Sequence, residues 1–91
     1  MKLICLDYDN TYTEFKSLCD MIIDKQSEFG YKVIMCTMRK PNETNEELEK
    51  LEKRINVHYS SRQAKRDFLK SIGIEPSIWI DDNPLWIYND G

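Results

Sequence analysis

Several short runs of the chain are apolar without interruption, and they are separated by stretches in which apolar residues recur at helical spacing. The clearest runs are residues 2–6, 33–36 and 78–80. Unbroken apolar runs of this length are typical of strands covered on both faces, as in a parallel sheet. Residues 55–59 predict a further short strand, and residues 85–88 predict one last strand.

The stretches between these strands predict three helices. The first has apolar residues at helical spacing, namely Phe15, Leu18, Cys19, Ile22 and Phe29. Thr11 and Glu14 form a candidate capping box at its start, and Gly30 stands where a helix-ending glycine is expected. A second helix is predicted over residues 44–55, whose first residue pairs with Glu47 as a capping box. A third is predicted over 60–73, whose first residue pairs in the same way with Gln63.

Strands that alternate with helices predict an α/β fold with a parallel sheet and right-handed crossovers. We expect a three-layer, Rossmann-like arrangement with helices on both faces of the sheet. Domains usually contain ~100–150 residues. The chain has 91 residues, so residues 1–91 are expected to form a single minimal domain.

The charge and the residue composition of the chain argue against several classes of function. The net charge of −3 argues against nucleic-acid binding through bulk electrostatics, although it is compatible with a small basic site. The three cysteines are odd in number and form no C-x-x-C pattern, so we expect reduced, structural thiols and a cytoplasmic protein. The only histidine, His58, has no neighbour at ligand spacing, which argues against zinc. No apolar stretch approaches the ~20 residues of a membrane helix, and the first strand leaves no room for a signal peptide.

Polar side chains gather where the predicted strands end. They are Asp7, Asp9, Thr37, Asp81, Asp82 and Asn83. In a parallel sheet these ends meet at one edge, and ligands bind there. Helices begin at the same edge, so Lys65, near the start of the third helix, is expected to reach it.

This combination of groups predicts phosphoryl transfer. Carboxylates this close repel one another and need a shared cation or proton. Oxygen ligands without histidine or cysteine suit Mg²⁺, and a lysine and a threonine beside it suit a phosphoryl group. Asp7, at the rigid end of the strand, would attack phosphorus and form an aspartyl-phosphate, and Asp9 would act as the acid and then the base. Asp81, with Asp82, would anchor the metal.

Three stretches of the sequence resemble the motifs of the haloacid dehalogenase-like (HAD) phosphohydrolase superfamily. They are LICLDYDNT (3–11), VIMCT (33–37) and IWIDD (78–82), and Lys65 matches the lysine motif between the last two. The resemblance spans most of the chain and implies a Mg²⁺-dependent phosphatase with a HAD-like fold. The catalytic set that it implies is Asp7, Asp9, Thr37 and Lys65, and the metal ligands are Asp7, Asp9 through its backbone carbonyl, Asp81 and Asp82. Of these, Thr37 and Lys65 would bind the transferring phosphoryl group.

The sequence departs from the family in what should follow the first motif. Members usually carry a squiggle and a β-hairpin flap there, but here a helix is expected within a few residues of Asp9, so the flap is tiny or missing. No insertion is long enough for a cap. A site without a cap suits a bulky phosphorylated substrate, such as a nucleic-acid end or a phosphoprotein, or one completed by a second subunit of a homo-oligomer. Arg39 is a candidate for substrate binding, with an ordinary loop charge as the alternative.

Each motif has a simpler interpretation on its own. Residues 9–11 suit a turn and a helix cap, residues 81–84 suit a turn, and an isolated Lys65 would be a surface residue. Two other functions also use such a cluster. One is a non-catalytic phosphate- or nucleotide-binding module on the same scaffold. The other is a response-regulator-type receiver domain, but there the phosphorylated aspartate ends the third strand, which here ends in His58 and Tyr59.

Overall fold

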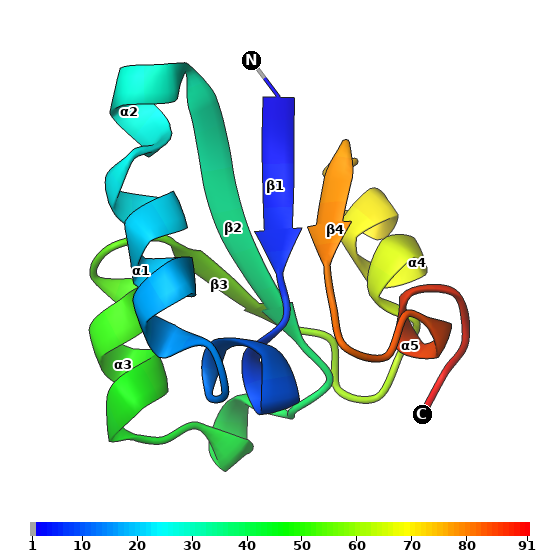
Figure 1. Cartoon of the computed structure of the whole chain (residues 1–91). Coiled ribbons are helices and arrows are strands. Elements are labelled where there is room, and N and C mark those ends of the chain that lie inside the picture. Colours follow the sequence, from blue (N-terminus) through cyan, green and yellow to red (C-terminus); the bar gives the residue numbers. More distant parts are fainter. Residues whose placement is uncertain (1) are drawn as a thin grey trace.

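The computed structural model describes residues 2–91, which form an α/β fold around a four-stranded parallel sheet (Figure 1). The strands are β1 (Lys2–Leu6), β2 (Tyr31–Thr37), β3 (Asn56–Tyr59) and β4 (Ile78–Ile80), in the spatial order β3-β2-β1-β4. β1 pairs with β2 on one side and with β4 on the other. The first four strands expected from the sequence and their parallel arrangement are therefore confirmed.

Two separate groups of buried side chains pack against the sheet. One contains Leu6 and Met35 from the strands, together with residues of the helices α1 (Lys16–Asp24) and α3 (Glu46–Glu52). The other contains Cys5, Ile34 and Cys36 and includes a leucine of α4 (Lys65–Ser71). Because successive side chains of a strand point to opposite faces, the strand residues of the two groups belong to opposite faces of the sheet.

The first predicted helix is divided into three pieces. A single irregular turn, η1 (Tyr8–Tyr12), directly follows Asp7, and α1 and α2 (Gln26–Phe29) come after it. Gly30 ends α2 in the left-handed region, with φ 71°, as expected. The capping box at Thr11 is wrong, because the Thr11 hydroxyl bonds to aspartates at the end of the sheet.

The starts of the other two helices also differ from expectation. Asn45, not Thr44, caps α3, and its side chain accepts a 2.8 Å hydrogen bond from the backbone N–H of Leu48. The Glu47 side chain accepts instead from the Tyr8 hydroxyl. α4 begins only at Lys65, because Ser61 and Arg62 both have positive φ and form a turn where a helix was predicted.

The prediction of a strand at residues 85–88 is wrong. These residues form α5 (Leu85–Tyr88), which begins after Pro84 with its helical φ of −63° and ψ of −11°. The helix packs against α4 and buries Ile87, so tertiary contact decides its conformation. The remaining element is a short 3-10 helix, η2 (Pro41–Glu43).

The cysteines lie in the core, and the helices are short. Cys5, Cys19 and Cys36 are free and buried. Within residues 2–91, no helix has both the length and the apolar character needed to cross a membrane.

Candidate functional site

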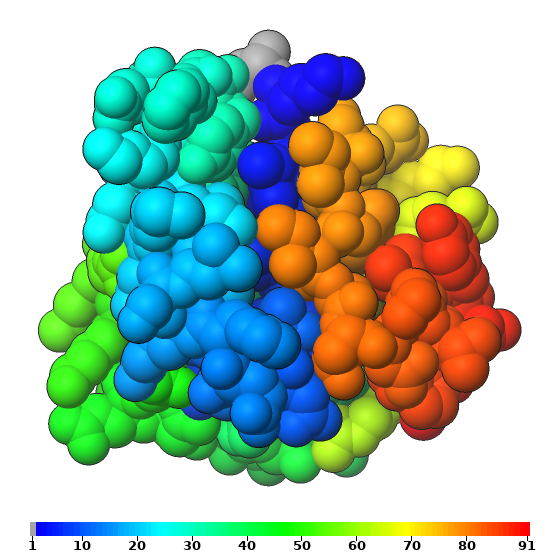
Figure 2. Space-filling view, viewed as in Figure 1, coloured from blue at the N-terminus to red at the C-terminus, as the bar shows by residue number. Residues whose placement is uncertain are grey.

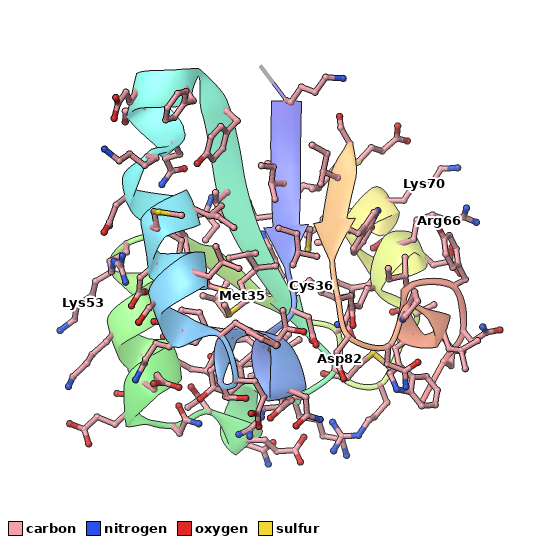
Figure 3. All side chains as sticks on the ribbon, in the orientation of Figure 1. Met35, Cys36, Lys53, Arg66, Lys70 and Asp82 are labelled. Carbon is pink, nitrogen blue, oxygen red and sulfur yellow. The ribbon has the colours of Figure 1, made fainter. Side chains whose placement is uncertain are left out.

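Three aspartates meet where β1 and β4 end. Asp7 follows β1, and its backbone N–H donates to the carbonyl oxygen of Ile80 at 2.9 Å, which joins the ends of the two strands. Asp81 and Asp82 follow β4, and Figure 3 labels Asp82 near the end of that strand. One carboxylate oxygen from each of these aspartates lies within 4.8 Å of the others. The structure therefore brings together three of the four aspartates that the sequence placed at this edge.

The side chain of Lys65 lies between two of these carboxylates. Its Nζ is 2.7 Å from Oδ1 of Asp7 and 2.7 Å from Oδ2 of Asp81, and the residue is only 1% exposed. Three carboxylates and one ammonium leave two negative charges in excess when all are ionised. A cluster of this kind is stabilised by a proton or a cation.

The pKa of Asp7 is shifted mainly by burial. Burial raises the pKa of Asp7 to about 7, although the charge of Lys65 acts against the shift. Burial acts to lower the pKa of Lys65, but the charge of Asp7 and hydrogen bonds to Asp7 and Asp81 outweigh it, so that pKa is raised. Lys65 is therefore an ammonium group, and near neutral pH Asp7 holds a proton part of the time when no other cation is present.

Thr11 is a member of the site that the sequence analysis assigned only to a helix cap. Its hydroxyl is 3.0 Å from Oδ2 of Asp7 and 3.2 Å from Oδ1 of Asp82. The backbone N–H of Asp82 donates to the Thr11 oxygen at 3.1 Å. Figure 2 shows the blue segment that contains η1 against the orange segment that follows β4. Thr11 thus fixes the position of one acidic segment relative to the other, and the only sequence signal was its place in the D-x-D-x-T pattern.

Asp9 lies apart from the three clustered aspartates and pairs with Arg39. Nε of Arg39 is 3.0 Å from Oδ2 of Asp9, and Nη2 is 2.9 Å from Oδ1, which is a two-pronged ion pair. Nη1 donates to the carbonyl oxygen of Glu43 at 2.8 Å, and the guanidinium lies 5.2 Å from the ring centre of Tyr8. Arg39 therefore lines the cavity and pairs with the side chain of Asp9, and its role in substrate binding stays a prediction.

Thr37 ends β2 and is completely buried. Its hydroxyl oxygen accepts a 3.3 Å hydrogen bond from the backbone N–H of Arg39. Since that oxygen already accepts, its own proton is left to donate. Within residues 2–91, the walls of the neighbouring cavity include neither Thr37 nor Asp81.

A cavity of about 640 Å³ opens beside the aspartates. It is lined by Asp7, Asp9, Asn10, Met38, Arg39, Glu43, Arg62, Lys65, Asp82, Asn83, Trp86 and Gly91. Its volume falls in the range of ~300–1,000 Å³ usual for small-molecule sites. Arg62 and Trp86 come from a turn and a helix that the sequence analysis did not connect with the site.

His58 stays outside this arrangement. It is half-buried on β3, burial lowers its pKa, and among the described residues its buried Nε2 has no hydrogen-bond partner. Among residues 2–91, His58 is not one of the residues that line the cavity.

The acidic cluster offers oxygen donors alone. Among the described residues it contains Asp7, Asp81 and Asp82 and neither histidine nor cysteine. Oxygen donors are the ligands that Mg²⁺ prefers.

Comparisons of the chain with models of protein families, with curated proteins and with solved structures gave no match.

Proposed function

We propose that this protein is a Mg²⁺-dependent phosphohydrolase that works through an aspartyl-phosphate on Asp7. The observation that carries the proposal is the buried contact of Lys65 with Asp7 and Asp81, beside Asp82. This is a group of oxygen ligands with one fixed ammonium, next to an open cavity. Such an arrangement suits a phosphoryl group that is bound together with a divalent cation.

The fold that we propose is a three-layer, Rossmann-like domain of the HAD type without a cap. Two groups of buried residues on opposite faces of the sheet support the layers. The turn η1, directly after Asp7, is similar to the squiggle of that family. Among residues 2–91, the segment between η1 and α1 contains no β-hairpin, which is why we propose an open site.

The metal ligands that we propose are the carboxylates of Asp7, Asp81 and Asp82, with the backbone carbonyl of Asp9. The two excess negative charges of the cluster fit a divalent cation. Bound there, Mg²⁺ would neutralise charge on the phosphoryl oxygens. Lys65 offsets charge on the same side. The role of Thr37 as a phosphoryl ligand rests on the family resemblance alone, because Thr37 is completely buried and, within residues 2–91, is not among the residues that line the cavity.

The reaction follows from these positions in two steps. A carboxylate oxygen of Asp7 forms a bond to phosphorus while the bond from phosphorus to the leaving oxygen breaks, and Asp9 gives that oxygen a proton. A water molecule then attacks phosphorus, Asp9 takes the proton of the water, and the bond between phosphorus and Asp7 breaks to release phosphate. Lys65 and Thr11 hold the Asp7 carboxylate in place, each through one of its oxygens. An open cavity, with no cap domain among residues 2–91, fits a bulky phosphorylated substrate, for which a nucleic-acid end or a phosphoprotein qualifies.

A second candidate is a non-catalytic module that binds phosphate or nucleotides. The observation that favours it is the ion pair of Asp9 with Arg39, since an aspartate in this pair is not free to transfer protons to a leaving group.

The test is hydrolysis of an aryl phosphate ester with Mg²⁺ and with EDTA, for the wild type, Asp7→Asn and Asp67→Asn. We expect turnover that needs Mg²⁺ and falls at least about a thousandfold in Asp7→Asn. Asp67→Asn is the control, because it makes the same change at an exposed position of α4. Absence of turnover with retained binding of phosphate or beryllofluoride would favour the binding module. Absence of both would overturn both functions.

A further inference from the structure

Two arginines, Arg39 and Arg62, line the cavity together with Lys65. Arg39 comes from the loop after β2, and Arg62 comes from the turn before α4. Nη1 of Arg62 donates to the carbonyl oxygen of Met38 at 2.6 Å, and Nη2 donates to Oε2 of Glu43 at 2.9 Å. Each guanidinium is held by a backbone carbonyl and faces a carboxylate, so both are oriented as donors to an anion.

The backbone that carries Arg62 is strained. Among residues 2–91, the non-glycine residues with positive φ are Asn10, Ser61 and Arg62, and two of these line the cavity. Left-handed conformation is unfavourable for residues such as serine and arginine, and it persists only where surrounding contacts impose it. Here the backbone N–H groups of Ser61 and Arg62 donate to the carbonyl oxygens of Arg39 and Met38. These bonds join the two arginine-bearing loops and bring the two residues to one cavity.

The anions that now face the arginines are carboxylates of the protein. Arg39 holds Asp9, and Arg62 holds Glu43. The ion pair with Arg39 engages the carboxylate of Asp9, which would act as acid and base in the proposed reaction. An oxyanion of the substrate that bound Arg39 would replace this carboxylate and leave Asp9 free to turn toward the leaving oxygen.

We propose that Arg39 and Arg62 bind a second phosphate group of the substrate, and that this contact releases Asp9 for proton transfer. The inference rests on the proposed function and names its substrate class: a phosphomonoester whose leaving group carries another phosphate. Planar guanidinium groups suit phosphate oxygens because they donate two parallel hydrogen bonds. Trp86 and Met38, on the same cavity wall, provide apolar surface for a nucleoside between the two phosphates. The second phosphate is either the other phosphate of a nucleoside bisphosphate or the phosphodiester that follows the terminal nucleotide of a polynucleotide.

The test compares substrates that differ only in the second phosphate. For adenosine 3′,5′-bisphosphate we expect a kcat/KM at least about tenfold above that for either adenosine monophosphate. In Arg62→Ala this preference should fall close to one. Arg66→Ala is the matched control and should keep the preference, because Arg66 lies over Tyr88 and away from the cavity walls described. If Arg62→Ala folds poorly, Arg62→Gly removes the same side chain and accepts the positive φ of this position.

Equal kcat/KM values for the bisphosphate and the monophosphates, or a preference unchanged in Arg62→Ala, would overturn the inference and leave the phosphatase standing. If the wild type hydrolyses no phosphomonoester, the phosphatase fails, and binding of the same compounds to the wild type with Mg²⁺ tests the arginine pair. Binding of the bisphosphate at least about tenfold tighter than the monophosphates would support the pair, and equal binding would overturn it. A short oligonucleotide with a terminal phosphate, compared with the bisphosphate, identifies the source of the second phosphate.

Discussion

Lys65 and Asp7 are 58 positions apart in the chain, yet Nζ of Lys65 lies 2.7 Å from Oδ1 of Asp7 in a buried contact. The same ammonium bonds Asp81 at the end of the neighbouring strand. The contact therefore joins the start of α4 to the ends of β1 and β4, and it is both a structural link and the centre of the proposed site.

Replacing Lys65 with methionine should destabilise the protein as well as abolish phosphatase activity. The substitution leaves Asp7 and Asp81 buried without their positive partner, and breaking such a pair typically costs about 3–5 kcal/mol. Urea unfolding at pH 8 with EDTA measures the loss. Because a divalent cation compensates the same charges, Mg²⁺ should recover part of it. A Lys65→Met protein as stable as the wild type in EDTA would contradict this account of the cluster.

Replacing Asp7 with asparagine should inactivate the enzyme but stabilise the metal-free protein at pH 8. The pKa of Asp7 in the folded protein is about 7, above the value of 3.8 for an unperturbed aspartate. A group whose pKa is raised by folding contributes stability that is fully present below the unfolded pKa and lost as the pH rises through the folded pKa. The stability advantage of Asp7→Asn in EDTA should therefore be largest at pH 8 and shrink toward pH 5. Chemical unfolding of both proteins over this range measures it, and an Asp7→Asn protein less stable than the wild type at pH 8 would contradict the raised pKa.

Mg²⁺ should bind more tightly as the pH rises toward 8. A metal-ligating carboxyl must lose its proton, and the pKa of Asp7 of about 7 means that Mg²⁺ competes with a proton below that pH. The apparent Kd, measured by calorimetry, should rise by close to tenfold per pH unit well below 7 and level off above it. An apparent Kd that stays constant from pH 6 to pH 8 would argue against Asp7 as a ligand.

Replacing Thr11 with valine should reduce activity and Mg²⁺ affinity together. Valine keeps the shape but removes the single hydroxyl proton that lies within reach of both the Asp7 and the Asp82 carboxylates, together with the oxygen that accepts from the backbone N–H of Asp82. We expect a loss of about 10–100-fold in Mg²⁺ affinity or in kcat/KM. Thr11→Ser is the control, since it keeps the hydroxyl and should stay near the wild type. If Thr11 served only as a helix cap, neither quantity would change in the valine variant.

The local sequence was sufficient for the four strands of the sheet and for the edge at which the polar residues gather. Short apolar runs in the order of a βαβ fold leave little freedom, since a parallel sheet places all strand ends on one side. Asp7, Asp81 and Lys65 could therefore be assigned to one edge before any contact was known. Gly30 likewise ends its helix because its backbone alone accepts the left-handed conformation without cost.

The errors arose where a residue had both a local and a distant partner. Thr11 could cap a helix, but the aspartates at the sheet edge take its hydroxyl. The backbone N–H of Ala64 at the start of α4 is satisfied by Asp90, near the other end of the chain, so no side chain from the preceding turn was needed. Residues 85–88 have the composition of a strand, but they lie against α4 after Pro84 and form a helix.

The sequence by itself thus determined the parallel sheet and the meeting of the acidic residues with Lys65, because both follow from the order of strands and helices along the chain. Only the tertiary structure decided that Asp9 pairs with Arg39, that Arg62 and Trp86 line the cavity, and that Thr11 joins the aspartates. These contacts depend on how loops that are distant in the sequence are placed relative to one another. No local pattern of hydrophobic and polar residues determines that placement.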